Sequence, residues 1–148
     1  MNSNLMNNLQ RDISYRISSR DDGRIGLRAT MNDCYHDIVL DVVVNEETLT
    51  IEEISAEFRK CPTTDCPNAV KRLERLTGIT IGRGLNKQIA EALGGEEGCG
   101  NLRNLLLGLL PLAINVKAAS GFTDEQAMMD NVRKQMRGTC AGYPRLDD

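Results

Sequence analysis

The stretch GGEEGCGNLRNLL, residues 94–106, places a cysteine between two glycines where a polar loop turns into an apolar segment. The apolar residues that follow Cys99 predict a helix that begins at this point. A helix N-terminus offers free backbone N–H groups and the positive end of the helix dipole, and both stabilise a thiolate. A thiolate is the form of cysteine that binds metal or attacks an electrophile. Cys99 is therefore predicted to be a metal ligand or a nucleophile.

Three further cysteines lie at the ends of predicted elements. Cys34 comes just before a predicted strand, and Cys61 and Cys66 lie in the loop where strands give way to helices. His36, the only histidine, and Asp37 follow Cys34 closely. Soft thiolates together with an imidazole or a carboxylate suit zinc or an iron–sulfur cluster. The predicted metal ligands are therefore Cys34, His36, Asp37, Cys61, Cys66 and Cys99.

The spacing of these cysteines leaves other interpretations open. CPTTDC, residues 61–66, is a C-x4-C pair at the edge of the range of zinc sites, and no second close pair accompanies it. One alternative is a thiol redox protein or enzyme in which Cys99 is the reactive thiol and Cys61 or Cys66 is the resolving thiol. Another is a small interaction module whose cysteines are incidental, since cysteine is often simply buried.

Length and composition limit the class of protein. The chain has 148 residues, enough for one domain with a single core. It carries 18 basic and 21 acidic residues and few aromatic ones, so nucleic-acid binding is not expected. The longest apolar run, residues 105–116, is too short for a membrane span, and the N-terminus lacks the layout of a signal peptide. We therefore expect a cytoplasmic protein whose five cysteines are free thiols, metal ligands or redox groups.

The elements that must position these residues change in character near Cys61. Before it, alternating apolar and polar residues predict antiparallel strands, and after it apolar residues recur at helical spacing. The predicted strands cover residues 13–19, 24–31, 36–44 and 48–60, and the predicted helices cover 68–77, 85–93, 101–119 and 123–136. These elements predict an α+β domain over residues 12–148, in which helices cover one face of a three- to four-stranded antiparallel sheet. Residues 1–11 are Asn-rich and predicted to be flexible.

Within the predicted third helix, Leu102, Leu105, Leu106, Leu109 and Leu112 predict a central position in the core, and Pro111 predicts a kink. The last helix is predicted to be capped by Thr123. A meander whose helices return over one end would gather Cys34, Cys61, Cys66 and Cys99 at that end.

From His36 to about Leu112 the chain resembles a bacterial domain family of unknown function. That family has a His-Asp that opens a strand, a Cys-Pro, a Gly-Leu-x-Ile-Gly-x-Gly segment and a Gly-Cys-Thr-His-Leu helix start. The matching stretches here are HDIVLDV, DCPNAVKRLERLTGITIGRG and GCGNL. Asn101 stands where that family tends to have histidine.

A more distant likeness is to the iron–sulfur scaffold proteins of the IscU and NifU N-terminal type. It is carried by CYHDIVLDVVV, IEEISAEFRKC and IAEALGGEEGCGNL, which share the order of elements and of three cysteines. The resemblance implies a SufE/NifU-like fold and cluster ligands at Cys34, Asp37, Cys99 and either Cys61 or Cys66. It also implies a sulfur-donor protein or a cluster-accepting apoprotein as partner. The Leu-Pro-Pro-Val-Lys segment that chaperones recognise is replaced here by GGEEG, so chaperone handoff is not implied.

Overall fold

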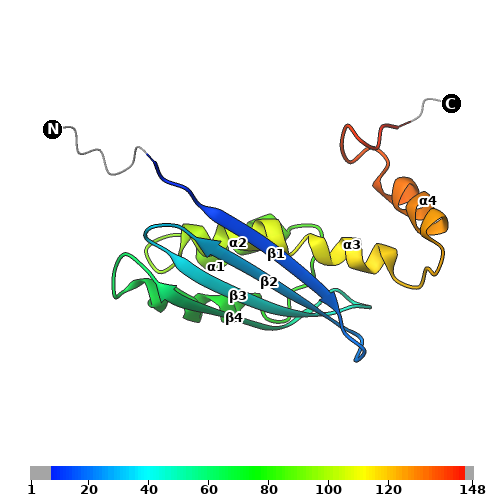
Figure 1. The fold of residues 1–148 in the computed structure, drawn as a ribbon. Helices are drawn as coiled ribbons and strands as arrows, with labels where there is room; N and C mark the ends of the chain where they lie inside the picture. Colours follow the sequence, from blue (N-terminus) through cyan, green and yellow to red (C-terminus); the bar gives the residue numbers. More distant parts are fainter. Residues whose placement is uncertain (1–7, 146–148) are drawn as a thin grey trace.

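The sheet is a four-stranded antiparallel meander in the order β1-β2-β3-β4 (Figure 1). The computed structural model describes residues 8–145. The strands are β1 (Asp12–Ser19), β2 (Arg24–Asn32), β3 (Asp37–Asn45) and β4 (Ile51–Lys60). Each lies within two or three residues of its predicted range, which confirms the predicted α+β class. The turn at Asp22–Gly23 joins β1 to β2, where Gly23 has a positive φ of 77°.

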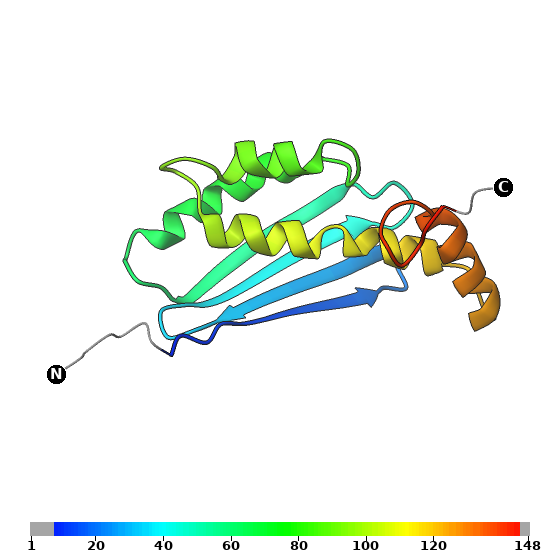
Figure 2. The same ribbon diagram turned by 90° about the horizontal axis from the view of Figure 1, so that it is seen from above.

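Alternation along the central strands separates an apolar face from a polar face. Ile25, Leu27, Ala29 and Met31 of β2 and Ile38, Leu40, Val42 and Val44 of β3 are almost fully buried beneath the helices. The opposite face carries polar pairs such as Arg28 with Asp41, whose Nε–Oδ1 distance is 2.8 Å. Figure 2 shows the helices on one side of the sheet only. The sheet is therefore covered on one face and open on the other, as is common for antiparallel sheets.

The first helical segment after the sheet is a 3-10 helix, η1 (Cys66–Leu76), and not the α-helix that the sequence predicts. Its apolar residues Val70, Leu73 and Leu76 recur every third residue. A 3-10 helix has 3.0 residues per turn, so this spacing aligns all three on one face. Leu73 and Leu76 are buried in the core and Val70 packs against it. The spacing thus favours the tighter helix, which lies against β4.

The predicted third helix is divided at Leu110–Pro111 into α2 (Gly100–Leu109) and α3 (Leu112–Ala119). Leu102, Leu105, Leu106 and Leu109 have no exposed surface, which confirms their central position. The predicted core position of Leu112 is only partly correct, because Leu112 is half-buried. The break in the helix places Leu110 and Ala113 in the core instead.

The stretch Gly100–Ala119 is long and apolar enough to cross a membrane by length and composition alone. Core helices also meet that criterion, and α2 packs against β2 and the preceding helix α1 (Leu85–Leu93).

The last helix, α4 (Glu125–Met136), contacts mainly α3 and buries none of its residues fully. Its N-cap is Asp124, whose side chain accepts a hydrogen bond from the backbone N–H of Gln126 at 3.1 Å. The prediction of Thr123 as the cap is therefore wrong by one residue. Figure 1 shows α4 beyond the end of the sheet, apart from the layer formed by α1 and α2.

Replacing Leu106 by Ala should lower the free energy of unfolding by about 2 to 5 kcal/mol, because it opens a cavity between α2 and the sheet. The matched control is Ile114→Ala on α3, where the side chain is 39% exposed and the change should cost less than about 0.5 kcal/mol. Urea denaturation of both variants measures the difference. Equal and small losses would mean that α2 does not pack in the core.

Candidate functional site

Four cysteines lie toward one end of the sheet. Cys34 lies in the turn between β2 and β3, and Cys61 directly follows β4. The pairing of Asp37 with Lys60 places that turn beside the end of β4. Cys66 begins η1, and Cys99 is the N-cap of α2. The meander therefore brings these thiols to one edge, although they belong to four different segments of the chain.

The turn between β2 and β3 is organised by the carboxylate of Asp33, whose side chain is fully buried. Its Oδ1 accepts hydrogen bonds from the backbone N–H groups of Tyr35 and His36, each at 2.8 Å. The same oxygen lies 2.9 Å from Nδ1 of His36. Its Oδ2 accepts from Nε of Arg11 at 2.8 Å. One carboxylate thus fixes both the backbone of the turn and the imidazole ring.

Asn101 closes this network into a ring. Its Nδ2 lies 3.2 Å from Nε2 of His36, and its Oδ1 accepts from Nη1 of Arg11 at 3.2 Å. Arginine offers only donors, so Asn101 must turn its oxygen toward Arg11 and its NH2 group toward His36. Nε2 of His36 is then the acceptor and Nδ1 carries the proton that is donated to Asp33. The closed ring ties the start of α2 to the turn.

The electrostatics of Asp33 follow from this ring. Burial by itself raises the pKa of a carboxylic acid, and it is the largest single influence on Asp33. The hydrogen bonds from Arg11, from the backbone of Tyr35 and from His36 together outweigh burial and hold the pKa of Asp33 well below its ordinary value. Asp33 is therefore a carboxylate throughout the physiological pH range.

The other predicted metal ligands near this turn are arranged differently. Both ring nitrogens of His36 are engaged in the ring, so a bond from Nε2 to a metal would displace Asn101. Asp37 alternates with the buried Ile38 and so lies on the open face of the sheet. Within residues 8–145, no three His, Cys, Asp or Glu side chains lie close enough together to hold a metal ion. Metal binding by the six predicted residues stays a prediction.

The loop CPTTDC brings two thiols to one side chain. The thiol of Cys61 donates to the carbonyl oxygen of Thr63 at 3.1 Å, and Oγ1 of Thr63 lies 3.4 Å from Sγ of Cys66. The hydroxyl hydrogen bond from Thr63 lowers the pKa of Cys66 below the ordinary value of a thiol, against the opposing effect of burial. Burial, followed by the neighbouring Cys66, raises the pKa of Cys61. The two thiols therefore differ, with the negative charge favoured on Cys66.

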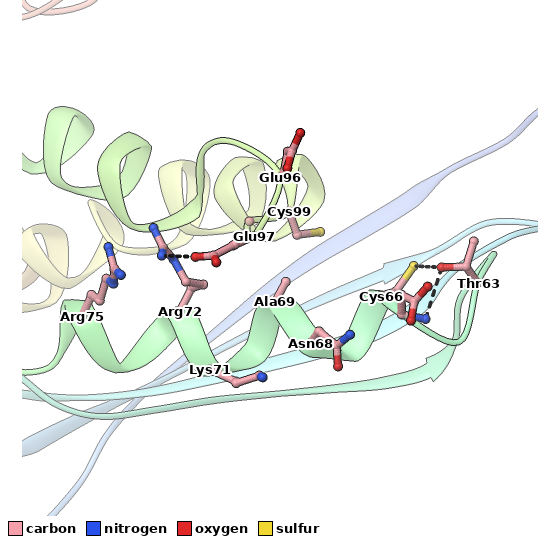
Figure 3. A pocket seen from close by; sticks show the side chains of 12 residues that line it. Thr63, Cys66, Asn68, Ala69, Lys71, Arg72, Arg75, Glu96, Glu97 and Cys99 are labelled. Carbon is pink, nitrogen blue, oxygen red and sulfur yellow. Dashed lines mark hydrogen bonds and ion pairs between the residues drawn. The ribbon is translucent and has the colours of Figure 1, made fainter.

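Cys66 and Cys99 line opposite sides of one groove of about 690 Å³, formed by η1 and the loop that precedes α2. Figure 3 shows the thiol of Cys99 directed over the groove toward the end of η1 that carries Cys66. The loop is closed tightly, because the backbone N–H of Cys99 donates to the carbonyl of Leu93 at 3.0 Å. A side chain at Gly98 would collide with that carbonyl, at 1.8 Å from the added Cβ. Glycine at 98 is therefore required to hold Cys99 on the groove wall.

Sequence reasoning missed Arg11, Asp33 and Thr63. Arg11 falls at the edge of the segment predicted to be flexible, yet it is held by Asp33 and Asn101. Residues 1–7 of that segment lie outside the described residues. Asp33 carried a local signal, since aspartate at the start of a short turn commonly accepts backbone hydrogen bonds. Nothing in the sequence marks Thr63 as a functional residue beyond its place between two cysteines.

The fold and the groove define the chain as an α+β domain with an open-faced sheet and a groove along η1 that is lined by Cys66 and Cys99. The family model described as "Protein of unknown function (DUF2889)" matches residues 9–115. The chain therefore belongs to this family, which confirms the resemblance to a domain family of unknown function. No curated protein and no solved structure matches the chain. The likeness to iron–sulfur scaffold proteins therefore rests on the order of elements and cysteines alone.

The matched range contains every residue of the polar ring and of the groove. Arg11 is near its start, and α3 crosses its end at residue 115. The helix α4 lies beyond the match.

Replacing Asp33 by Asn should change how stability depends on pH. The folded pKa lies below the unfolded value of about 3.9, so the unfolded chain takes up the proton first as pH falls. The contribution of Asp33 is thus complete above about pH 5 and is lost at lower pH. We expect Asp33→Asn to cost on the order of 1 to 3 kcal/mol at pH 7, and this cost should shrink toward pH 3.

Urea denaturation of the wild type and the variant at pH 7, 5, 4 and 3 measures this dependence. Asp21→Asn, in the exposed β1–β2 turn, serves as the control and should leave the profile unchanged. A constant difference between the wild type and Asp33→Asn at all four pH values would contradict the assignment of a low pKa to Asp33.

Proposed function

We propose that this protein exchanges thiols and disulfides, with Cys66 as the attacking thiol and Cys61 as the resolving thiol. The observation that supports this function best is the bridging position of Thr63. Its carbonyl accepts from Cys61 while its hydroxyl lies within hydrogen-bond distance of Cys66. Attack on a disulfide requires a thiolate, and the thiolate is favoured on Cys66 by the lowered pKa of that thiol.

The proposed reaction has two steps. The Cys66 thiolate attacks one sulfur of a substrate disulfide, whose S–S bond breaks, and the other half leaves as a thiolate that takes a proton from water. Cys61 then loses its proton to solvent and attacks Sγ of Cys66, which releases the second half as a thiolate that also takes a proton from water. The substrate gains two electrons and two protons, and the protein forms a Cys61–Cys66 disulfide.

This assignment differs from the redox alternative that the sequence offers, in which Cys99 is the reactive thiol. Cys99 does lie at the predicted helix start, as the N-cap of α2, but its side chain makes no capping hydrogen bond. Cys66 also begins a helix and has the hydroxyl of Thr63 in addition. Cys99 lines the same groove, so a substrate joined to Cys66 by a mixed disulfide would lie beside it.

Binding of zinc or of an iron–sulfur cluster is the second candidate function. It is favoured by the gathering of Cys34, Cys61, Cys66 and Cys99 at one end of the sheet. A ligand set would have to be completed by movement of the turn or of the loop before α2. A sulfur-donor protein or a cluster-accepting apoprotein would then be the partner. Iron, zinc and acid-labile sulfide analysis of protein purified without oxygen tests this candidate.

The redox proposal is tested by trapping the first step. Reduced protein treated with 2-hydroxyethyl disulfide should end with a Cys61–Cys66 disulfide and no adduct on either of these two cysteines. The Cys61→Ser variant should stop at a stable mixed disulfide on Cys66, located by mass spectrometry of peptides. The Cys140→Ser variant, which changes an exposed cysteine in the C-terminal tail, is the control. Modification of Cys34 or Cys140 with none at Cys66 would contradict the proposal.

The role of Thr63 is tested by its replacement with Val, which removes the hydroxyl and keeps the shape. Loss of the hydrogen bond should raise the pKa of Cys66 and slow its alkylation by iodoacetamide at pH 7 about two- to tenfold. Thr64→Val, at the exposed neighbouring residue, should leave the rate unchanged. Equal rates in the wild type and in Thr63→Val would mean that Thr63 does not stabilise the thiolate.

A further inference from the structure

The groove beside Cys66 is lined by both acidic and basic side chains. One acidic and one basic side chain, those of Glu97 and Arg72, form an ion pair with each other. Nη1 of Arg72, in η1, donates to Oε2 of Glu97 at 2.7 Å. Nε and Nη2 of Arg72 donate to the carbonyl oxygens of Ala92 at 2.9 Å and Glu91 at 3.4 Å. These contacts tie η1 to the end of α1 and to the loop before α2. Arg72 and Glu97 therefore build the groove wall and leave the recognition of a ligand to other side chains.

The other charged residues of the groove make no ion pair within residues 8–145: Asp65, Lys71, Arg75 and Glu96. The acidic ones lie at the thiol end, since Asp65 precedes Cys66 and Glu96 lies three residues before Cys99. Figure 3 shows Arg75 at the other end of the groove. Arg75 lies nine positions after Cys66 in η1, a distance of about 18 Å at about 2.0 Å per residue of a 3-10 helix. The groove is thus acidic near the sulfurs and basic farther along η1.

We propose that this groove selects a small peptide-like aminothiol or its disulfide, with an ammonium group near the sulfur and a carboxylate about three residues away. The inference rests on the proposed thiol–disulfide exchange at Cys66. The ammonium group would lie between Asp65 and Glu96, and the carboxylate would reach the guanidinium of Arg75, which pairs well with carboxylates.

The size of the groove agrees with such a ligand. A volume of about 690 Å³ is within the range of small-molecule sites. An extended tripeptide spans about 10 Å. The side chain of Arg75 can reach back along η1 to cover the remaining distance. The net charge of −3 on the whole chain would by itself disfavour an anionic group, so a preference for a free carboxylate would have to come from the groove.

The proposed step is the exchange described above with a named class of substrate. The Cys66 thiolate forms a bond to one sulfur of a peptide disulfide, the peptide S–S bond breaks, and the second peptide leaves as a thiolate that takes a proton from water. The bound peptide is then released by Cys61. No other oxidant or reductant enters the reaction.

Three disulfide-linked peptide dimers test the proposal: Cys-Gly-Gly, N-acetyl-Cys-Gly-Gly and Cys-Gly-Gly-amide. The rate of each with the reduced protein is divided by its rate with dithiothreitol, which removes differences in intrinsic reactivity. The unblocked peptide should react about three- to fivefold faster than either blocked peptide, the range expected for one exposed ion pair.

Two variants assign each preference to its end of the groove. Arg75→Gln should abolish the advantage of the free carboxylate and keep that of the free amine, and Glu96→Gln should do the reverse. Arg83→Gln, at an exposed arginine outside the groove, is the control for a change in net charge. A structural effect alone would change all three rates by the same factor.

The outcomes separate this inference from the proposed function. If no peptide forms a mixed disulfide at Cys66 in the Cys61→Ser protein, thiol–disulfide exchange itself is wrong. If all three react at Cys66 with equal normalised rates, or if Arg75→Gln slows all three equally, the exchange stands and the class of substrate is wrong.

Discussion

The carboxylate of Asp33 is the interaction on which the functional end of the fold depends. It is buried, it accepts from two backbone N–H groups, and it binds Arg11 and His36 through its two oxygens. Through Asn101 the same network reaches the first turn of α2. A buried charge with one partner removed is costly, so these groups hold one another in place. The wall of the groove that carries Cys99 is built from that anchored helix start.

The sheet could be predicted from the sequence because its signals are local. Alternation along β2 and β3 and the Asp-Gly turn before β2 specify a hairpin with one buried face. The helices were harder to define. The three-residue spacing of Val70, Leu73 and Leu76 favours the 3-10 form, but in a segment this short it also fits an α-helix. Pro111 signals a break but not the rotation that leaves Leu112 half-buried.

The site could be predicted only in part, for a different physical reason. The order of the cysteines along a meander indicates that they meet at one end, and that follows from connectivity. Which thiols share a partner depends on side-chain geometry, as in the contacts of Cys61 and Cys66 with Thr63. The occupation of both ring nitrogens of His36 depends likewise on Asn101, 65 positions away in the chain. Such contacts depend on side-chain geometry and leave little trace in the spacing of residues along the sequence.

In the proposed function, the end of the sheet is a rigid framework that holds a reactive loop. The ring fixes the turn and the start of α2, Arg72 fixes the loop before α2 to η1, and the CPTTDC loop supplies the chemistry between them. Within that loop, the proposed Cys61–Cys66 disulfide and its two thiols form one two-electron couple.

A redox titration with peptide mapping tests this claim most directly. Reduced protein is equilibrated in dithiothreitol buffers of graded potential, quenched with an alkylating agent, and digested to locate each cysteine. The account predicts that Cys61 and Cys66 lose their thiols together in a single two-electron transition and appear as one disulfide-linked peptide, while Cys34 and Cys140 remain alkylated. Separate transitions for Cys61 and Cys66, or a disulfide that joins either of them to Cys34, would contradict it.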